Sequence, residues 1–229
     1  MPPEASAIAV PAPSVFGRFR SLRWGGGLAL AASRGAAMAG QVAVQMAVGA
    51  LSGPVGLGVL QLFTAWTNVL GELAARGYPT QVLRRVSVAW HRGDRADCAG
   101  TVDRGRTVIR RGVSVVLLPA ASGFLLALTL ADDPDLIRAT GLAVGVVAAA
   151  GLFALIRLFS DALKATDAPL PAVTLESLVL PAAVLLVCAG CAVFSTTLTP
   201  ILIVAGVMLG LAASALGLSR TFRRRVGRA

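Results

Sequence analysis

Charged residues are scarce in this chain of 229 residues, where they make up 14% of the total. An ordinary soluble domain carries about 25%. Three cysteines and one histidine, His91, are too few for a disulfide framework or a histidine-based metal site. Lysine is almost absent, because 20 of the 21 basic residues are arginine. The composition excludes an ordinary soluble enzyme, and we expect no metal and no cofactor.

Apolar residues are correspondingly abundant, because 56% of the chain is hydrophobic and its mean hydropathy is +0.77. They gather in six stretches, each close to one bilayer thickness. The stretches are about 28–51, 55–73, 112–131, 139–156, 173–194 and 198–218. The sequence therefore predicts an all-α integral membrane protein, in which residues 25–219 form one bundle of six transmembrane helices. Residues 1–24 are expected to be a disordered cytoplasmic tail, and residues 220–229 a basic one.

The basic residues predict the orientation of these helices. Arginines occur three times in the N-terminal tail, nine times in residues 74–111 and five times in the C-terminal tail, all on one face together with Arg157 and Lys164. The opposite face has only Arg138, beside three aspartates. By the positive-inside rule both termini are cytoplasmic. We expect the membrane to be the cytoplasmic (inner) one. Because the bases set topology, the net charge of +10 does not indicate a nucleic-acid partner.

Residues 74–111 are too polar to span a membrane and too periodic to be a plain loop. Within residues 80–91, apolar side chains recur at helical spacing with arginines between them. Two interpretations stay open: a cytoplasmic amphipathic helix on anionic headgroups, or a solvated helical extension of the second span. Residues 104–111 are expected to continue into the third span.

The first two spans each carry one polar stripe. Offsets of seven and eleven residues place the polar side chains of each span within about 20° of one another. The stripes are Arg34, Gln41 and Gln45 in the first span and Gln61, Asn68 and Glu72 in the second.

A short turn at residues 52–54 makes these two spans antiparallel neighbours, and Arg34 and Glu72 then lie at the same depth. An Arg34–Glu72 ion pair is geometrically allowed and would lower the desolvation penalty of both charges. The stripes either hold the helix hairpin together or line an aqueous cavity in which Arg34 offers a cation to an anionic substrate. The second interpretation makes Arg34, Gln41, Gln45, Asn68 and Glu72 the candidate substrate-binding residues.

Other polar residues and prolines mark the cytoplasmic rim and two spans. Arg157, Asp161 and Glu176 are expected to form a structural ion pair or to extend to the headgroups, in preference to forming a substrate gate. Pro119 and Pro181 interrupt the third and fifth spans, either as broken helices along a transport path or as packing kinks.

Catalytic motifs are missing from the sequence. It has no zinc-protease helix motif, no phosphate-binding Walker loop, no serine-hydrolase elbow and no aspartate-rich magnesium motif. We therefore expect a protein that is not an enzyme and that binds or transports a ligand.

Three segments resemble the polysaccharide (O-antigen-type) flippases of the MATE-like transporter superfamily. Residues 51–63 resemble the first outer turn and the entry to the second helix, residues 77–94 the cytoplasmic end of helix two, and residues 158–169 the loop between helices four and five. The resemblance implies two pseudo-symmetric six-helix bundles that move lipid-linked sugar by alternating access. It also implies that a cavity arginine, here Arg34, engages the substrate pyrophosphate.

The six spans of this chain correspond to the N-terminal half of that family. The leading hypothesis is accordingly one bundle of a flippase that translocates lipid-linked oligosaccharide for cell-surface polysaccharide, such as lipopolysaccharide. Its expected partners are membrane lipid, the lipid-linked oligosaccharide and a second six-helix bundle, from a missing C-terminal half or another chain. A cation-coupled multidrug exporter of the same fold and a non-transporting helical scaffold are the alternatives.

Overall fold

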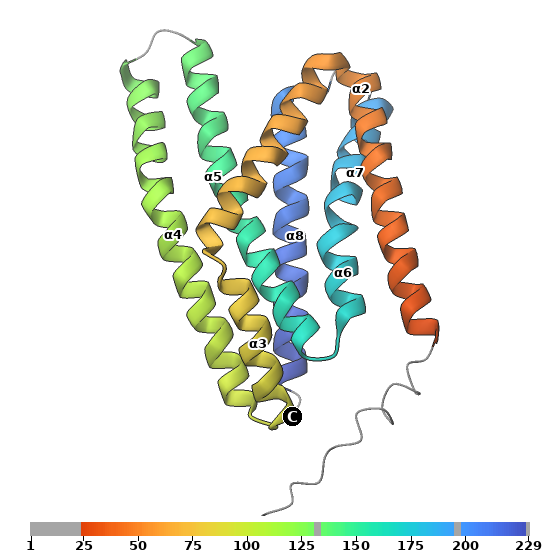
Figure 1. The fold of residues 1–229 in the computed structure, drawn as a ribbon. Helices are drawn as coiled ribbons and strands as arrows, with labels where there is room; N and C mark the ends of the chain where they lie inside the picture. The colour runs from red at the N-terminus through yellow and green to blue at the C-terminus, as the bar shows by residue number, and fades with distance from the viewer. Residues whose placement is uncertain (1–23, 131–133, 195–197, 228–229) are drawn as a thin grey trace, which may run out of the picture.

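The computed structural model describes residues 24–130, 134–194 and 198–227, and all secondary structure in these residues is helical (Figure 1). The helices run α2 (Trp24–Ala75), α3 (Tyr78–His91), α4 (Arg95–Leu130), α5 (Pro134–Ala165), α6 (Pro169–Ser177), α7 (Val179–Val193) and α8 (Pro200–Gly227). Five segments are long and apolar enough to cross a membrane: 27–75, 95–126, 139–165, 169–193 and 200–227. The prediction of an all-helical multi-pass membrane bundle is confirmed at this level.

The first of these segments contains two predicted spans, because α2 bends sharply at Gly53. The backbone there has φ 66° and ψ −163°, a conformation that is essentially restricted to glycine. Residues 24–52, the first leg, and residues 54–75, the second leg, therefore run in opposite directions (Figure 1). The Ser52 hydroxyl donates to the Leu198 carbonyl at 3.1 Å, which ties the bend to the start of α8. The predicted turn at residues 52–54 is confirmed.

The fifth predicted span, 173–194, is not one straight helix but is divided into α6 and α7 at Leu178. Proline lacks an N–H and clashes with the carbonyl four residues earlier, which for Pro181 is that of Ser177, the last residue of α6. The predicted interruption at Pro181 is therefore confirmed. Pro119 behaves differently, since α4 continues on both sides of it. The interpretation of Pro119 as a helix break is therefore wrong, and the alternative of a packing kink stays a prediction.

The segment 74–111 forms a second packing region at one end of the bundle. Arg76 and Gly77, with φ of 48° and 69°, separate α3 from α2. Val82 and Val86 on α3 are fully buried, and α3 packs on α4 and α5. The amphipathic helix is confirmed, but its apolar face contacts protein and is not available to headgroups. Nor is α3 a continuous extension of the second span.

The same region encloses Cys98 of α4, which is fully buried. Its Sγ contacts the Val86 carbonyl of α3 at 3.8 Å. Cys98 therefore acts as a small apolar residue that joins α3 to α4.

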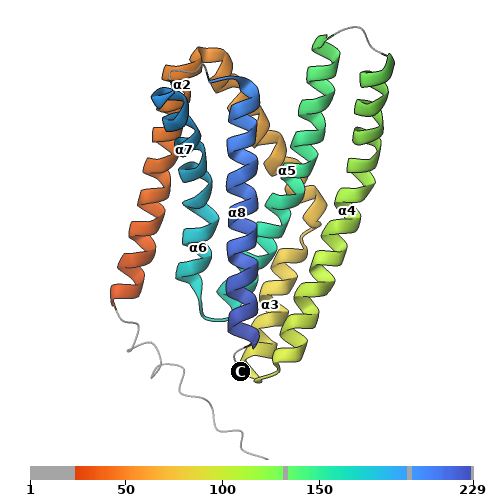
Figure 2. The same ribbon diagram turned by 180° about the vertical axis from the view of Figure 1, so that it is seen from behind.

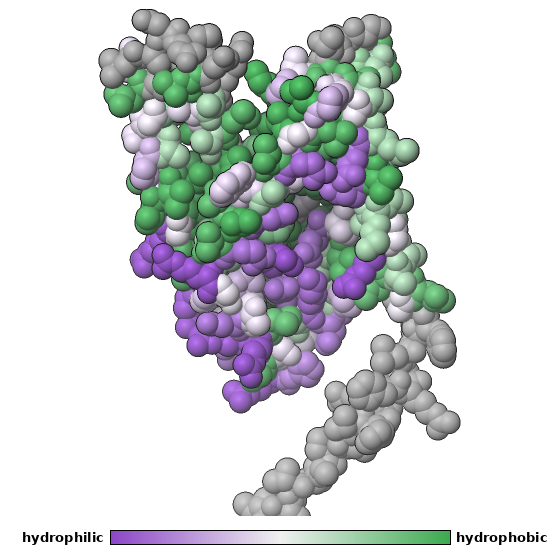
Figure 3. Space-filling view, turned by 45° about the horizontal axis from the view of Figure 1, so that its top comes forward, coloured by the Kyte–Doolittle hydropathy of each residue, from purple (hydrophilic) through white to green (hydrophobic). Residues whose placement is uncertain are grey.

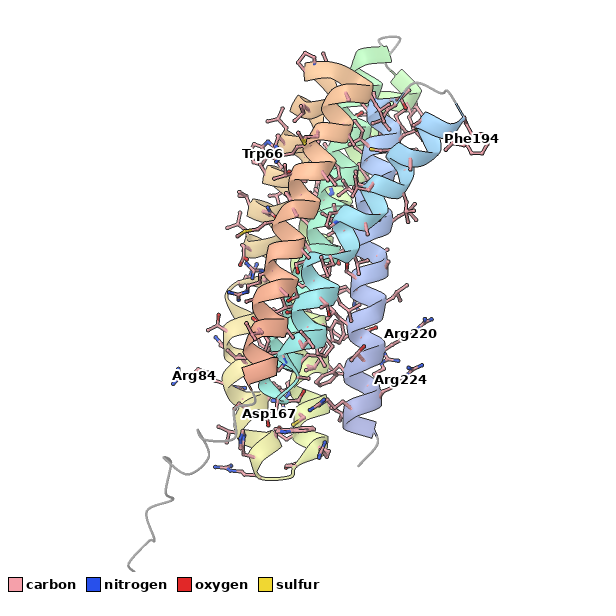
Figure 4. All side chains as sticks on the ribbon, turned by 90° about the vertical axis from the view of Figure 1, so that its right-hand side faces the viewer. Trp66, Arg84, Asp167, Phe194, Arg220 and Arg224 are labelled. Atoms are coloured by element: carbon pink, nitrogen blue, oxygen red, sulfur yellow. The ribbon has the colours of Figure 1, made fainter. Side chains whose placement is uncertain are left out.

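Hydrophilic and hydrophobic side chains separate along the bundle axis. Figure 3 shows hydrophilic side chains gathered at the end that carries α3, and hydrophobic ones over most of the remaining face. In Figure 4, Arg84, Arg220 and Arg224 lie toward that same end, whereas Phe194 lies near the opposite one. Trp66 points away from the bundle and is 56% exposed, as expected of a side chain that faces lipid.

Gly210 provides a test of the packing between α7 and α8. A Cβ at Gly210 would lie 2.9 Å from the Cα of Leu180 and 3.1 Å from the Ala183 Cβ, so the two backbones would have to separate. We expect Gly210→Ala to destabilise the bundle by about 1–3 kcal/mol, measured by unfolding in detergent. Gly190→Ala on α7, where no atom lies within 4 Å, should be neutral or stabilising by up to about 1 kcal/mol. Equal losses in the two variants would contradict this packing.

Candidate functional site

A pocket of about 370 Å³ lies between the two legs of α2, with α5 to α8 completing its wall. We call it the central pocket. Apolar side chains, among them Phe153, Ile156, Leu180 and Leu211, form much of its surface. Its polar lining residues come from both legs of α2 and from α6 and α8: Gln41, Thr64, Thr67, Asn68, Glu176, Ser177 and Ser214.

The bend at Gly53 explains how both legs reach the same pocket. Gln41 precedes the bend by 12 residues and Asn68 follows it by 15, which at 1.5 Å per residue are distances of about 18 and 22 Å. Because the legs are antiparallel, both side chains arrive at a similar depth. Two of the five sequence-predicted site residues, Gln41 and Asn68, thus meet in one pocket.

The other three predicted residues lie elsewhere. Gln45 is partly buried on the first leg, and Arg34 is exposed on the same leg. Neither of them lines the central pocket, and nor does Glu72. The Glu72 carboxylate is instead 3.0 Å from Arg157 of α5. The ion pair that the sequence allowed between Arg34 and Glu72 is replaced by one between Arg157 and Glu72.

Arg157 belongs to an ion-pair network beside the pocket. It also approaches Glu176 of α6 at 3.6 Å, so its guanidinium joins the second leg of α2 to α6. Glu176 further accepts hydrogen bonds from Lys164 at 3.1 Å and from the Ser160 hydroxyl. The prediction of a structural ion pair among the rim residues is confirmed for Arg157 and Glu176.

The network also includes Asp161, 3.3 Å from Lys164. Three carboxylates thus face two basic groups, and the side chains of Glu176 and Asp161 are only 22% and 20% exposed. Partial burial strengthens such pairs relative to surface ion pairs, because water screens them less. The network therefore fixes the relative positions of α5, α6 and the second leg of α2 at one end of the pocket.

Two buried hydroxyls in the pocket have no hydrogen-bond partner among the described residues: those of Thr67 and Ser214. Thr67 is 3% exposed and Ser214 is fully buried. Leaving a buried hydroxyl unpaired costs about 1–3 kcal/mol, so such groups usually meet water or a ligand. Sequence reasoning missed both, because a single threonine or serine in an apolar helix is typical of close helix packing.

The break between α6 and α7 lies beside the same pocket. Because Pro181 has no N–H, the Ser177 carbonyl loses the donor that a continuous helix would supply. Ser177 lines the central pocket. The pocket combines side-chain amide and hydroxyl groups with an apolar wall, a combination suited to a ligand that both donates and accepts hydrogen bonds.

The partner of Glu72 is testable by double-mutant cycles on the free energy of unfolding in mixed micelles. With side chains 42% and 55% exposed, the Arg157–Glu72 pair should show a coupling of about 0.5–1 kcal/mol in Arg157→Gln and Glu72→Gln variants. The matched cycle of Arg34→Gln with Glu72→Gln should give a coupling within about 0.3 kcal/mol of zero. A larger coupling to Arg34 than to Arg157 would overturn the observed pairing.

Comparisons with protein-family models, with curated proteins and with solved structures find no match to this chain. The functional argument therefore rests on the central pocket, its polar lining and its position in the bundle.

Proposed function

We propose that this chain is one bundle of a membrane flippase that translocates a lipid-linked oligosaccharide by alternating access. The observation that carries the proposal is a polar pocket within an otherwise apolar bundle, with two buried hydroxyls that lack partners. Polar groups at membrane depth are expensive, and they normally face a cavity, a substrate or one another. A pocket of about 370 Å³ is within the range of ligand-binding cavities.

The chemistry of the lining supports a sugar. Sugar hydroxyls donate and accept hydrogen bonds, and they match the side-chain amides of Gln41 and Asn68 as well as the hydroxyls of Thr67 and Ser214. The apolar wall suits the ring faces of a saccharide and the first carbons of a lipid carrier. The lipid carrier of the substrate would stay in the bilayer, beside the lipid-facing side chains of the helices.

Arg34 supplies a cation for the diphosphate of such a substrate. It precedes Gln41 by seven residues, which places it two turns along the same helix face, about 10 Å closer to the start of α2. It has no acidic partner within 4 Å among the residues that the structure describes, and its side chain is exposed. A diphosphate at the pocket mouth would give it a bidentate partner.

A second bundle completes the proposed transporter. Gln41 and Asn68 are exposed on α2 although they lie within its apolar legs. Side-chain amides are unfavourable against acyl chains, so this face requires water or protein. A second six-helix bundle, or a second copy of the chain, would form the opposite wall of the substrate cleft.

The end of the bundle that carries α3 is the proposed cytoplasmic side of an inner membrane. The arginines of α3, those of the first part of α4 and those of the last part of α8 all occur at this end (Figures 1 and 4). The positive-inside rule assigns such an end to the cytoplasm, and both termini with it.

A cation-coupled multidrug exporter is a second candidate, favoured by the Glu176 carboxylate in the pocket lining. Lys164 and Arg157 both contact that carboxylate, at 3.1 and 3.6 Å, so its charge is already balanced. A cationic drug would have to displace these bases. The neutral hydrogen-bonding groups of the pocket therefore favour the sugar.

Direct binding tests the proposal, with a polyprenyl-diphosphate oligosaccharide as probe and the protein in nanodiscs. Asn68→Leu should weaken binding about tenfold, because one lost hydrogen bond of this kind is worth about 1–1.5 kcal/mol. Gln61→Leu removes an exposed amide of the same leg that does not line the pocket, and it should leave affinity unchanged.

Transport provides the second readout of the same experiment. Proteoliposomes that contain the complete transporter, this chain together with its second bundle, should move the fluorescent oligosaccharide lipid between leaflets, and Arg34→Gln should slow that movement. Binding of a cationic dye in preference to the oligosaccharide would favour the exporter. Binding of neither compound would favour the non-transporting scaffold and would refute the proposal.

A further inference from the structure

A second cavity lies on a different side of the bundle, where α4 and α8 both pack on α5 but touch each other little. Figure 2 shows α4 and α8 on either side of α5. The cavity between them has a volume of about 700 Å³, and we call it the side groove. The side groove and the central pocket have no lining residue in common. On α8, for example, Met208 lines the groove, whereas Val207 and Leu211 line the pocket.

The two ends of the side groove differ in chemistry. At one end, α4 contributes Asp103, Arg106, Thr107 and Arg110. At the other end the lining is apolar, with Leu117 on α4, Leu152 on α5 and Met208 on α8. The groove is therefore amphipathic along its length.

The groove crosses the boundary between charged and apolar sequence. Arg110 and Arg111 are the last charged residues of α4, because residues 112–130 contain none. From Asp103 to Leu117 is 14 residues, or about 21 Å along a helix. The polar end thus lies at headgroup level, and the apolar end lies within the hydrocarbon layer.

Arg110 is the group at the polar end that lacks a partner. Arg106 is 3.4 Å from Asp103 and is balanced by it, whereas Arg110 has no carboxylate within 4 Å among the described residues. A further base, Arg223 of α8, lies close by, because it lines an adjoining cavity together with Asp103 and Arg106. The polar end is therefore net positive.

We propose that the side groove binds a membrane phospholipid with an anionic headgroup, in the leaflet at the basic end of the bundle. Arg110 and Arg106 contact the phosphate, and the Thr107 hydroxyl lies beside it. One acyl chain lies along the apolar part of the groove, where the small side chain of Ala148 on α5 leaves room between α4 and α8. Charge complementarity and the position at the interface identify this occupant.

Gly151 is itself part of the groove's construction. A Cβ there would lie 3.1 Å from a methyl of Val113, so glycine allows α4 to approach α5 closely at this level. The groove is consequently bordered by a firm helix contact and is not a gap that a small shift of α4 would close. This property does not depend on the proposed function of the central pocket.

Native mass spectrometry of the whole chain in detergent tests the proposal, with phosphatidylglycerol and phosphatidylcholine as probes after delipidation. Wild-type protein should bind phosphatidylglycerol about tenfold more tightly than phosphatidylcholine. Arg106→Gln combined with Arg110→Gln should abolish that preference. Arg104→Gln combined with Arg111→Gln removes two charges from the same helix outside the groove, and it should keep the preference.

A separate variant tests whether an acyl chain lies in the apolar end of the side groove. Ala148→Phe should fill the apolar end and weaken phosphatidylglycerol binding, while leaving oligosaccharide binding by the central pocket unchanged. Equal losses in both arginine pairs would mean general attraction to a basic surface and would overturn the proposal. Displacement of the lipid by inorganic phosphate alone, or equal binding of phosphatidylcholine, would overturn it as well.

These outcomes are separate from those of the central pocket. Asn68→Leu should leave phosphatidylglycerol binding intact, whereas it weakens the oligosaccharide. Retention of the lipid preference in a protein that binds no oligosaccharide would refute the proposed function and leave the side groove as a lipid site.

Discussion

The hydrocarbon layer offers no hydrogen-bond partners, so each polar group in the bundle needs one within the protein or in a cavity. The ion-pair network meets this constraint in part: the terminal nitrogens of Arg157 pair with Glu72 and Glu176 from two other elements, whereas its Nε has no partner among the described residues. The hydroxyls of Thr67 and Ser214 do not follow it among the described residues, and both lie in the central pocket. That these two unpaired hydroxyls lie in one pocket is the physical basis for proposing a ligand there.

The two ends of the molecule are held together by different forces. At the basic end, large apolar side chains such as Val82, Ile109 and Leu163 are fully buried, as in a soluble domain where water drives their burial. In the apolar spans, lipid is as apolar as the side chains, so that driving force is missing. Close contacts of glycine, such as Gly210 against Leu180, take its place. The basic end thus serves as a rigid base from which the apolar helices extend.

The two proposed sites are surrounded by different kinds of helix. The central pocket lies among elements that bend or break, at Gly53 of α2 and at Leu178 before α7. The side groove lies against α5, in a region bordered by the close contact of Gly151 and Val113. A substrate that crosses the membrane requires walls that move, whereas a bound structural lipid requires walls that stay in place. Movement of the central pocket's walls would have to open the pairs that Arg157 makes with Glu72 and Glu176, or carry α5, α6 and the second leg of α2 together.

Composition and periodicity by themselves determined the helical class, the approximate spans, the turn at Gly53, the amphipathic helix near residues 80–91 and the clustering of bases at one end. These features depend on local rules: helix period, backbone conformation of glycine and proline, and the length that a bilayer imposes. Only the tertiary structure decided which polar groups meet. Glu72 pairs with Arg157, not with Arg34, because α5 packs against the second leg of α2, and no pattern within one helix encodes that neighbour. Gln41 and Asn68 reached a common pocket, but Thr67, Ser214 and the side groove were not foreseen, since each depends on the packing of helices distant in sequence.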